Sequence, residues 1–313
     1  MSKWCRSFII LIYKSLRENQ KVSIRRRTAF FFFTSNIYLL IFKKFTKTDF
    51  DSSEITMNSS ILQFIIVDDV KIAACYRQGH NRPGLVWLGG YRSNMTGQKA
   101  VAIDTFAKRR GLSALRHDYS GHGISQGDFF QGTISGWLKQ SLAVFERFAD
   151  GPQILIGSSM GGWIALRMAQ ELKKRYIKLI GMVLIAPAPD FTSTLIEQIL
   201  TESQKLALEK KGFFEVQSEL GSIPYTKVLI DDGHNNLVMD GLINCECPIH
   251  ILQGMQDKCV PYEHTLKLME HLSLGDVTLT LIKDGNHQLS RPQDLDCLES
   301  SIETLLTTGN NSL

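Results

Sequence analysis

The fold of this chain is decided by the stretch QILIGSSMGGWIALRMA, residues 153–169. The short apolar run Gln153–Ile156 is typical of a buried parallel strand, and the residues from Met160 to Lys174 are predicted to form a helix. Between them lies Gly157-Ser158-Ser159-Met160-Gly161, a G-x-S-x-G pentapeptide. A serine in so sharp a strand-to-helix turn needs small flanking residues, and the turn lifts its hydroxyl into the cleft. This context predicts Ser159 as a nucleophile.

The pentapeptide alone is a weak signal, so other interpretations stay open. The glycines could serve only a tight turn, with Ser159 as the N-cap of the helix. Ser158 is a rival hydroxyl, although it is not the central residue. If Ser159 is the nucleophile, Met160 stands at a helix N-terminus, where unpaired amides and the helix dipole stabilise a developing oxyanion. We therefore predict Met160 N–H as one oxyanion donor.

Strands and helices alternate on both sides of this stretch. Such alternation predicts an α/β fold with a mostly parallel sheet and helices on both faces. The predicted strands are a hairpin of Ile61–Val67 and Val70–Arg77 turning at Asp68-Asp69, then Leu85–Leu88, Leu112–Arg116, Gln153–Ile156, Leu179–Ile185, Ile249–Leu252 and Val277–Ile282. The predicted helices are Gln98–Arg110 with a C-cap at Gly111, Thr133–Ala149 with an N-cap at Thr133, Met160–Lys174 and Pro292–Leu306.

One segment interrupts this alternation. Between Ala186 and Cys247 no buried strand is evident, and Leu195–Lys211 is predicted to be helical. An insertion here lies over the carboxyl ends of the strands, where open α/β sheets bind ligands, so we predict a small helical cap at about residues 190–244. Its apolar residues either accept an acyl chain at the active-site edge or only pack the cap onto the sheet; they are Leu195, Ile196, Ile199, Leu200, Leu206 and Leu208.

A serine nucleophile needs a base, and the base needs an acid that orients it. In this type of fold the three residues follow one another as serine, acid and histidine. Asp257 follows the predicted strand Ile249–Leu252, and His287 follows Val277–Ile282, so both lie at the same edge of the sheet. We predict that Ser159, Asp257 and His287 form a catalytic triad.

Other histidines and acids are weaker candidates. His234, in the cap, is a candidate for substrate contact. Asp284 is close to His287 in sequence and is interpreted as a turn residue. Asp231 and Asp232, in the cap, are weaker rivals for the acid. The remaining histidines precede the serine or lie within a helix or strand and are expected to be structural: His80, His117, His122, His250, His264 and His271.

The second oxyanion donor is expected in the loop after the third strand. That loop reads Gly89-Gly90-Tyr91-Arg92-Ser93, and its glycines permit a close approach of the backbone. We predict Tyr91 N–H as the partner of Met160 N–H; the alternative is a plain glycine turn. Gly121-His122-Gly123 lacks the Lys-Ser/Thr of a phosphate-binding loop and is interpreted as a tight loop near the active-site mouth.

The first 56 residues differ in composition from the rest. They contain eleven Lys or Arg and four Asp or Glu, which gives a net charge of +7. Residues 57–313 contain 24 Lys or Arg and 27 Asp or Glu, which gives a net charge of −3. The apolar stretch Ala29–Phe42 is 14 residues long, shorter than the about 20 that a membrane-spanning helix needs. Three interpretations of residues 1–56 stay open. They are a transit peptide, a peripheral membrane anchor, or a segment outside the fold with translation starting at Met57. We favour the last, which predicts one domain at 57–313 and a cytoplasmic location; a transit peptide predicts the mitochondrial matrix.

Charge and cysteine spacing exclude other classes of function. Residues 57–313 have a slightly negative net charge and therefore lack the excess of basic residues that a nucleic-acid-binding surface needs. The six cysteines are expected to be free thiols, because Cys245-Glu246-Cys247 lacks the spacing of a zinc site and no matching histidine pair follows. We therefore predict no metal.

Three segments together resemble one subgroup of the α/β-hydrolase superfamily. They are Gly90–Ala100, Arg116–Gly123 and Gly151–Trp163. The subgroup contains the mitochondrial palmitoyl-protein thioesterase that is also an acyl-glucuronide esterase, together with bacterial relatives. The resemblance covers roughly residues 60–305, and the chain departs from it at Arg92, where relatives carry an uncharged residue.

The resemblance implies a serine hydrolase that cleaves carboxylic esters or thioesters through the predicted triad and needs no cofactor. The expected partner is a small-molecule ester or acyl thioester, with acylated proteins as a further class of substrate. The alternatives are an aminopeptidase or another hydrolase on the same triad, and a hydrolase-like binding protein without turnover.

Overall fold

The computed structural model describes residues 60–218, 221–273 and 275–309 of the 313-residue chain. The predicted extension at residues 1–56, with Cys5 and the boundary at Met57, lies outside these residues. Within them, eight strands form one sheet in the order β1-β2-β4-β3-β5-β6-β9-β10. The strands are β1 (Ile61–Val67), β2 (Val70–Arg77), β3 (Asn81–Leu88), β4 (Leu112–His117), β5 (Gln153–Ser158), β6 (Gly181–Ile185), β9 (Ile249–Gly254) and β10 (Val277–Ile282).

The pairing of the strands confirms the predicted sheet. β1 and β2 form the antiparallel hairpin, closed by the pair Val67 and Val70, and β2 runs antiparallel to β4. The remaining neighbours are parallel. Every residue of β5, β6 and β9 is buried, as expected for parallel strands covered on both faces. The carboxyl ends of β3, β5, β9 and β10 therefore meet at one edge.

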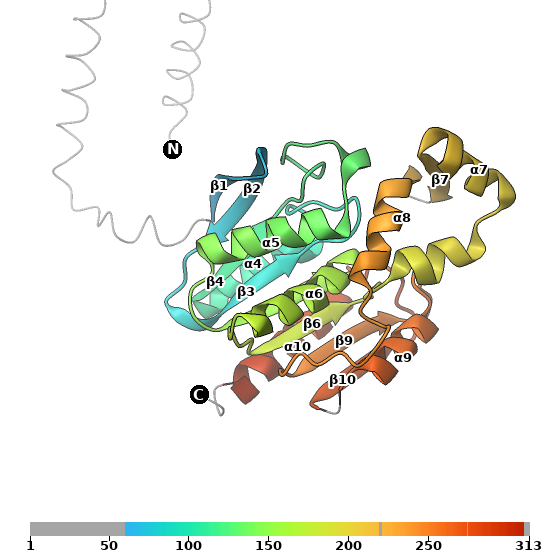
Figure 1. Ribbon diagram of the computed structural model, residues 1–313. Coiled ribbons are helices and arrows are strands. Elements are labelled where there is room, and N and C mark those ends of the chain that lie inside the picture. Colours follow the sequence, from blue (N-terminus) through green and yellow to red (C-terminus); the bar gives the residue numbers. More distant parts are fainter. Residues whose placement is uncertain (1–59, 219–220, 274, 310–313) are drawn as a thin grey trace, which may run out of the picture. The chain divides into compact units, whose positions relative to one another are not determined.

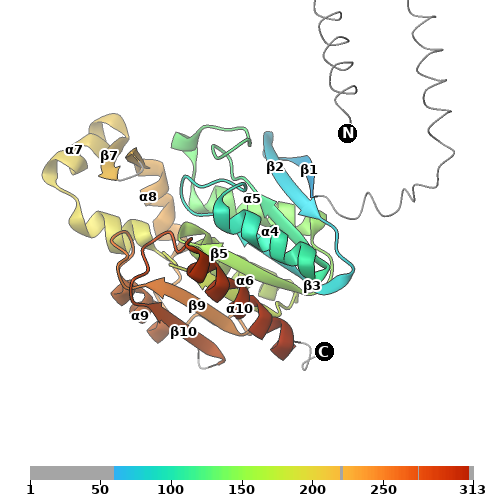
Figure 2. The same cartoon turned by 180° about the vertical axis from the view of Figure 1, so that it is seen from behind.

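Helices cover the two faces of the sheet and enclose two apolar clusters. Figure 1 shows α5 and α6 on one face, and Figure 2 shows α4 and α10 on the other. Trp137, Trp163 and Leu268 belong to the larger cluster, whereas Phe106 and Ile302 belong to the cluster on the opposite face. The helices are α4 (Gln98–Arg110), α5 (Ile134–Phe148), α6 (Met160–Lys174), α7 (Glu202–Lys211), α8 (Lys227–Gly233), α9 (Tyr262–His271) and α10 (Pro292–Gly309).

Two helix ends form as the sequence predicts. Gly111 follows α4 in the left-handed conformation, with φ 65°, and its N–H donates to the carbonyls at the end of the helix. Thr133 precedes α5, and its side chain accepts the N–H of Gly136 at 3.0 Å.

The cap differs from the prediction at its helix. Leu195–Lys211 is not one helix: residues 192–199 form short π- and 3-10 turns, and α7 begins only at Glu202. The reason is a capping box, in which the Thr201 side chain accepts Gln204 N–H while Gln204 Oε1 accepts Thr201 N–H. This arrangement requires an extended Thr201, which breaks the helix there.

The apolar cap residues between Leu195 and Leu208 therefore do not lie on one helix. Ile199 is 75% exposed and Leu206 is 47% exposed, and α7 has no buried residue. Leu195 and Ile196 do pack against the main core cluster. The prediction of one continuous helix is therefore wrong, and these residues do not share one helix face, whereas acyl binding by them stays a prediction.

The cap also contains a hairpin that was not predicted from the sequence. β7 (Phe213–Ser218) and β8 (Gly221–Thr226) pair antiparallel, and α8 follows with the Thr226 side chain as its N-cap. In Figure 1 the cap elements α7, β7 and α8 lie together at one end of the sheet. Among the residues described here, no helix has the length and apolar character needed to cross a membrane.

Candidate active site

Ser159 lies at the junction of β5 and α6 with an unusual backbone. Its φ is 56° and its ψ is −121°, a conformation that is strained for a residue with a side chain. The Ser159 N–H donates to the carbonyl of Ile185 on the neighbouring strand β6 at 2.9 Å. Such strain at a sharp strand-to-helix turn is the geometry predicted for the pentapeptide.

The flanking glycines are required by close backbone contacts. A Cβ on Gly157 would lie 2.3 Å from the carbonyl oxygen of Gly161. A Cβ on Gly161 would lie 2.1 Å from the carbonyl oxygen of Leu88 on β3. The turn can therefore form only with glycine at both positions, whatever the role of Ser159.

A continuous chain of hydrogen bonds joins the three predicted residues. The Ser159 Oγ lies 3.1 Å from His287 Nε2, and His287 Nδ1 lies 2.7 Å from Asp257 Oδ2. Because an ionised carboxylate only accepts, Nδ1 carries the imidazole proton and Nε2 is free to accept from the serine. These residues come from the ends of β5, β9 and β10, so the sheet edge brings together groups 128 residues apart.

Asp257 is surrounded by donors. Its Oδ1 accepts the N–H groups of Cys259 and Val260, both at 2.8 Å. Its Oδ2 accepts from His287 and, at 3.3 Å, from the amide of Gln253, a fully buried residue of β9. Thr265 of α9 in turn donates to Gln253 Oε1 at 2.8 Å. Gln253 gave no signal in the sequence, because an amide in an apolar strand has no motif.

The rival residues lie elsewhere. Asp284 pairs with Arg291 at 2.7 Å, and Asp231 pairs with Lys227 at 2.6 Å. Asp232 accepts the N–H of Ser135 at 2.8 Å, at the start of α5.

Neither the hydroxyl of Ser158 nor the imidazole of His234 lies in the hydrogen-bonded series of Ser159, His287 and Asp257. Ser158 is buried at the end of β5, and the hydroxyl that meets His287 belongs to Ser159. His234 lies 2.9 Å from Glu197 within the cap.

Both predicted oxyanion donors flank Ser159. A Cβ on Gly90 would lie 3.3 Å from Ser159 Cβ, so the loop that carries Tyr91 runs directly against the serine. Met160 is the first residue of α6, where helix amides have no intrahelical acceptor. Among the backbone hydrogen bonds within the described ranges, none uses the N–H of Tyr91 or of Met160.

The side chain of Tyr91 connects this loop to the cap. Its hydroxyl donates to the carbonyl of Pro224 at 2.6 Å, and its ring stacks on Tyr225 with centroids 5.6 Å apart. Phe129 and Phe191 also pack against the ring. Burial raises the pKa of the Tyr91 hydroxyl, which therefore stays protonated as a donor. The sequence predicted only a backbone role for Tyr91, and this side-chain contact was not predicted.

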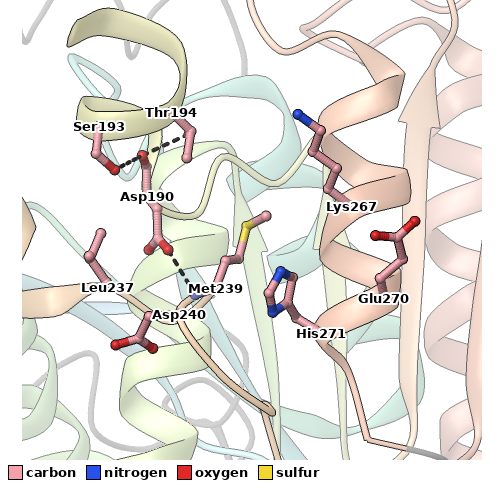
Figure 3. Close-up of a pocket in the computed structure, with 9 residues that line it drawn as sticks. All are labelled: Asp190, Ser193, Thr194, Leu237, Met239, Asp240, Lys267, Glu270 and His271. Carbon is pink, nitrogen blue, oxygen red and sulfur yellow. Dashed lines mark hydrogen bonds between the residues drawn. The ribbon is translucent and has the colours of Figure 1, made fainter. Parts of the chain in front are cut away.

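A cavity of about 350 Å³ lies where the cap joins α9. Figure 3 shows Asp190 at its wall, with Lys267, Glu270 and His271 on α9 opposite. The Asp190 carboxylate accepts the N–H groups of Val238 and Met239, so it joins the first and last parts of the cap. Burial raises the pKa of Asp190. The residues that line this cavity do not include the predicted triad.

The cysteines and charged groups of the described ranges are not gathered into a metal-binding cluster. The cysteines in the described ranges are free thiols, and burial raises the pKa values of Cys245 and Cys247 to about 12. Within the same ranges, no group of three or more His, Cys, Asp and Glu side chains is arranged to hold an ion.

Comparison with known proteins places this geometry in a family. The sequence profile named Serine aminopeptidase, S33 matches residues 85–227. The mouse mitochondrial palmitoyl-protein thioesterase ABHD10 is 34% identical over 248 residues, which cover 78% of this chain and 82% of the relative. The human protein of the same name is 33% identical over 248 residues, which cover 78% and 80%.

Solved structures agree. A crystal structure described as a hydrolase of Agrobacterium vitis S4 has 50% identity and a TM-score of 0.77, covering 79% of this chain and 98% of that one. The structure of mouse ABHD10 has 31% identity and a TM-score of 0.71, covering 80% and 99%. The chain therefore belongs to the α/β-hydrolase superfamily, as a serine hydrolase of the family that includes the ABHD10 palmitoyl-protein thioesterases.

Proposed function

We propose that this protein hydrolyses carboxylic esters or thioesters through Ser159, His287 and Asp257. Ser159 attacks the acyl carbonyl while His287 Nε2 accepts its proton. Asp257 holds the tautomer of His287 and stabilises the imidazolium that forms. The N–H groups of Tyr91 and Met160 bind the oxyanion of the tetrahedral intermediate. His287 then protonates the leaving alcohol or thiol, and water releases the acid by the same steps in reverse.

One observation carries this proposal. The hydrogen-bonded series Ser159, His287 and Asp257 stands at a positive-φ serine, with distances of 3.1 and 2.7 Å. A serine that only capped α6 would have no need of an imidazole, and the Ser159 side chain makes no capping hydrogen bond. The order of hydroxyl, imidazole and carboxylate supports their proposed roles as nucleophile, base and orienting acid.

The proposed bond class is drawn from the relatives. Proteins about one third identical to this chain are named palmitoyl-protein thioesterases, and a mouse protein that is 26% identical over 212 residues is named monoglyceride lipase. These names support acyl thioesters and esters as substrates, with acylated proteins as one class among them. A comparison of palmitoyl and acetyl thioesters with the matching p-nitrophenyl esters would rank the acyl length and the leaving group separately.

Amide cleavage is a second candidate, because the matching family profile is named for serine aminopeptidases. An aminopeptidase needs to bind a free α-amino group. Turnover of aminoacyl p-nitroanilides faster than of acyl p-nitrophenyl esters would favour this alternative.

Labelling with a fluorophosphonate tests the nucleophile directly, because the reagent reports an activated serine. We expect the wild-type protein to be labelled and Ser159→Ala to be unlabelled, with kcat lower by about 10³-fold or more. The neighbouring Ser158→Ala is the matched control and keeps its label. Labelling of Ser159→Ala, with loss in Ser158→Ala, would assign the nucleophile to Ser158.

The names of the relatives also bear on location. The ABHD10 relatives are named as mitochondrial proteins. This supports the transit-peptide interpretation of residues 1–56 over the cytoplasmic one, since residues 1–48 contain Glu18 as their single acid. A fluorescent protein carrying residues 1–56 at its N-terminus is expected in mitochondria; a diffuse cytoplasmic signal would contradict this.

A further inference from the structure

The turn that carries the Tyr91 amide contains an unusual residue. Gly90–Ser93 is a β-turn closed by the Ser93 N–H and the Gly90 carbonyl at 3.0 Å. Arg92 occupies its third position with φ 59°, where turns of this kind usually have glycine or asparagine. If the peptide between Tyr91 and Arg92 turned over, Arg92 would return to a negative φ. The observed turn therefore needs a contact that fixes this peptide.

His122 supplies that contact. Its Nε2 lies 3.1 Å from the Arg92 nitrogen, and its Nδ1 lies 3.1 Å from the carbonyl oxygen of Ser120. A carbonyl only accepts, so Nδ1 carries the proton and Nε2 accepts the Arg92 N–H. Burial lowers the pKa of His122 to about 4, so the ring remains neutral and able to accept near neutral pH.

The imidazole is itself held by α5. The Ser120 carbonyl also accepts the indole N–H of Trp137 at 3.2 Å, and the Ser120 N–H donates to Gln140 Oε1 at 2.8 Å. His122 is 3% exposed, and its ring packs at centroid distances of 5.1 Å on Phe129 and 5.2 Å on Trp137. A helix of the core is thus connected through one imidazole to the turn beside Ser159.

We infer that His122 is a positioning residue that holds the Tyr91–Arg92 peptide in its strained orientation and so fixes the Gly90–Ser93 turn, whose preceding peptide, Gly90–Tyr91, carries the N–H proposed to bind the oxyanion. The inference rests on the function proposed above, because it concerns the same site. It assigns a role to a histidine that the sequence analysis interpreted as structural. Its distinguishing feature is the acceptor atom Nε2, since ring packing alone does not select the peptide orientation.

A pair of substitutions separates the acceptor from the ring. His122→Phe keeps an aromatic ring without an acceptor, whereas His122→Gln places an amide oxygen at the same number of bonds as Nε2. We expect His122→Phe to lower kcat about 10-fold or more, with KM changed less than about twofold. We expect His122→Gln to recover most of kcat. If His122→Phe does not fold, His122→Asn, whose oxygen is one bond too short, replaces it with the same expectation.

The same substitution in an Arg92→Gly protein tests whether backbone strain at Arg92 makes the turn depend on His122. Glycine adopts a positive φ without strain, so Arg92→Gly should make the turn less dependent on His122. We expect His122→Phe to lose less kcat in the Arg92→Gly protein than in the wild-type background. An equal loss in both backgrounds would overturn the inference, as would full kcat in His122→Phe or a loss confined to KM. Activity remaining in Ser159→Ala would instead overturn the proposed function, whatever His122 does.

Discussion

At the residue scale, the two oxygens of Asp257 have different partners, and this makes asparagine an informative substitution. Oδ1 accepts two backbone N–H groups, and Oδ2 accepts from His287. An amide has one oxygen, which the two backbone donors would take. Its NH2 group would then face His287 Nδ1 and favour the tautomer with a proton on Nε2, which cannot accept from Ser159.

We therefore expect Asp257→Asn to lower kcat by up to about 10⁴-fold while the protein stays folded. Steady-state kinetics with an activated ester measures this. Asp284→Asn is the matched control, because Asp284 pairs with Arg291 near the same loop without touching His287. Equal losses in the two variants would contradict the assignment of Asp257.

Lys99 is a half-buried cation behind the loop that carries His287. Its ammonium donates to the carbonyl of Gln288, and burial lowers its pKa to about 8 from 10.5, although the charge of Asp294 opposes the shift. The unfolded chain keeps this proton up to about pH 10.5, whereas the folded protein releases it from about pH 8. The free energy of unfolding therefore rises with pH across this window, by at most about 1.4 kcal/mol per pH unit.

Replacement by methionine removes this dependence. We expect the free energy of unfolding of the wild-type protein, relative to Lys99→Met, to grow by up to about 2 kcal/mol between pH 8 and 9.5. Urea denaturation of both proteins at each pH measures the difference. A difference that stays constant with pH would show that Lys99 has the same pKa in the folded and unfolded chains.

At the element scale, the cap is closed by Asp190. This residue precedes the first turn of the cap, and its carboxylate accepts the amides of Val238 and Met239 at 2.8–3.1 Å. Figure 3 shows the contact with Met239. Its φ of 53° is tolerated by aspartate and asparagine better than by alanine. The side chain thus fastens two segments 48 residues apart.

We expect Asp190→Ala to lower the free energy of unfolding by about 2–3 kcal/mol, because two amides lose their acceptor. Asp190→Asn keeps one acceptor and the backbone preference, so it should lose less. Denaturant unfolding measures the stability, and hydrogen exchange at Val238 and Met239 shows whether the cap opens locally. Unchanged hydrogen exchange at these two amides in Asp190→Ala would contradict the role of the Asp190 carboxylate in holding the two cap segments together.

At the scale of the whole molecule, the described fold begins at Ser60. β1 pairs with β2 along its full length, and the eight-stranded sheet of the described residues is assembled from Ile61 onward. We expect a chain beginning at Met57 to be soluble, folded and as active as the full chain. Circular dichroism and ester turnover test this. Unfolding or loss of activity would mean that the first 56 residues pack on the domain.

The sequence by itself determined the strands of the main sheet, most of the helices that cover it and the chain order of the predicted triad residues. Each depends on a local pattern: an apolar run, a capping residue such as Thr133, or a polar residue in the loop that follows a strand, as with Asp257 and His287. Because the carboxyl ends of parallel strands meet at one edge, the strand assignments alone predicted that these side chains converge.

Only the tertiary structure decided what surrounds them. No short motif predicts the contact of the Gln253 amide with Asp257, of the His122 ring with the Arg92 N–H, or of the Tyr91 hydroxyl with the Pro224 carbonyl; the last spans 133 residues. The helix break at Thr201 follows from the capping-box pattern Thr-x-x-Gln, but the spacing of the apolar residues favoured a continuous helix. Local patterns fix elements because their causes are local, whereas positioning contacts depend on how distant elements pack, which periodicity does not encode.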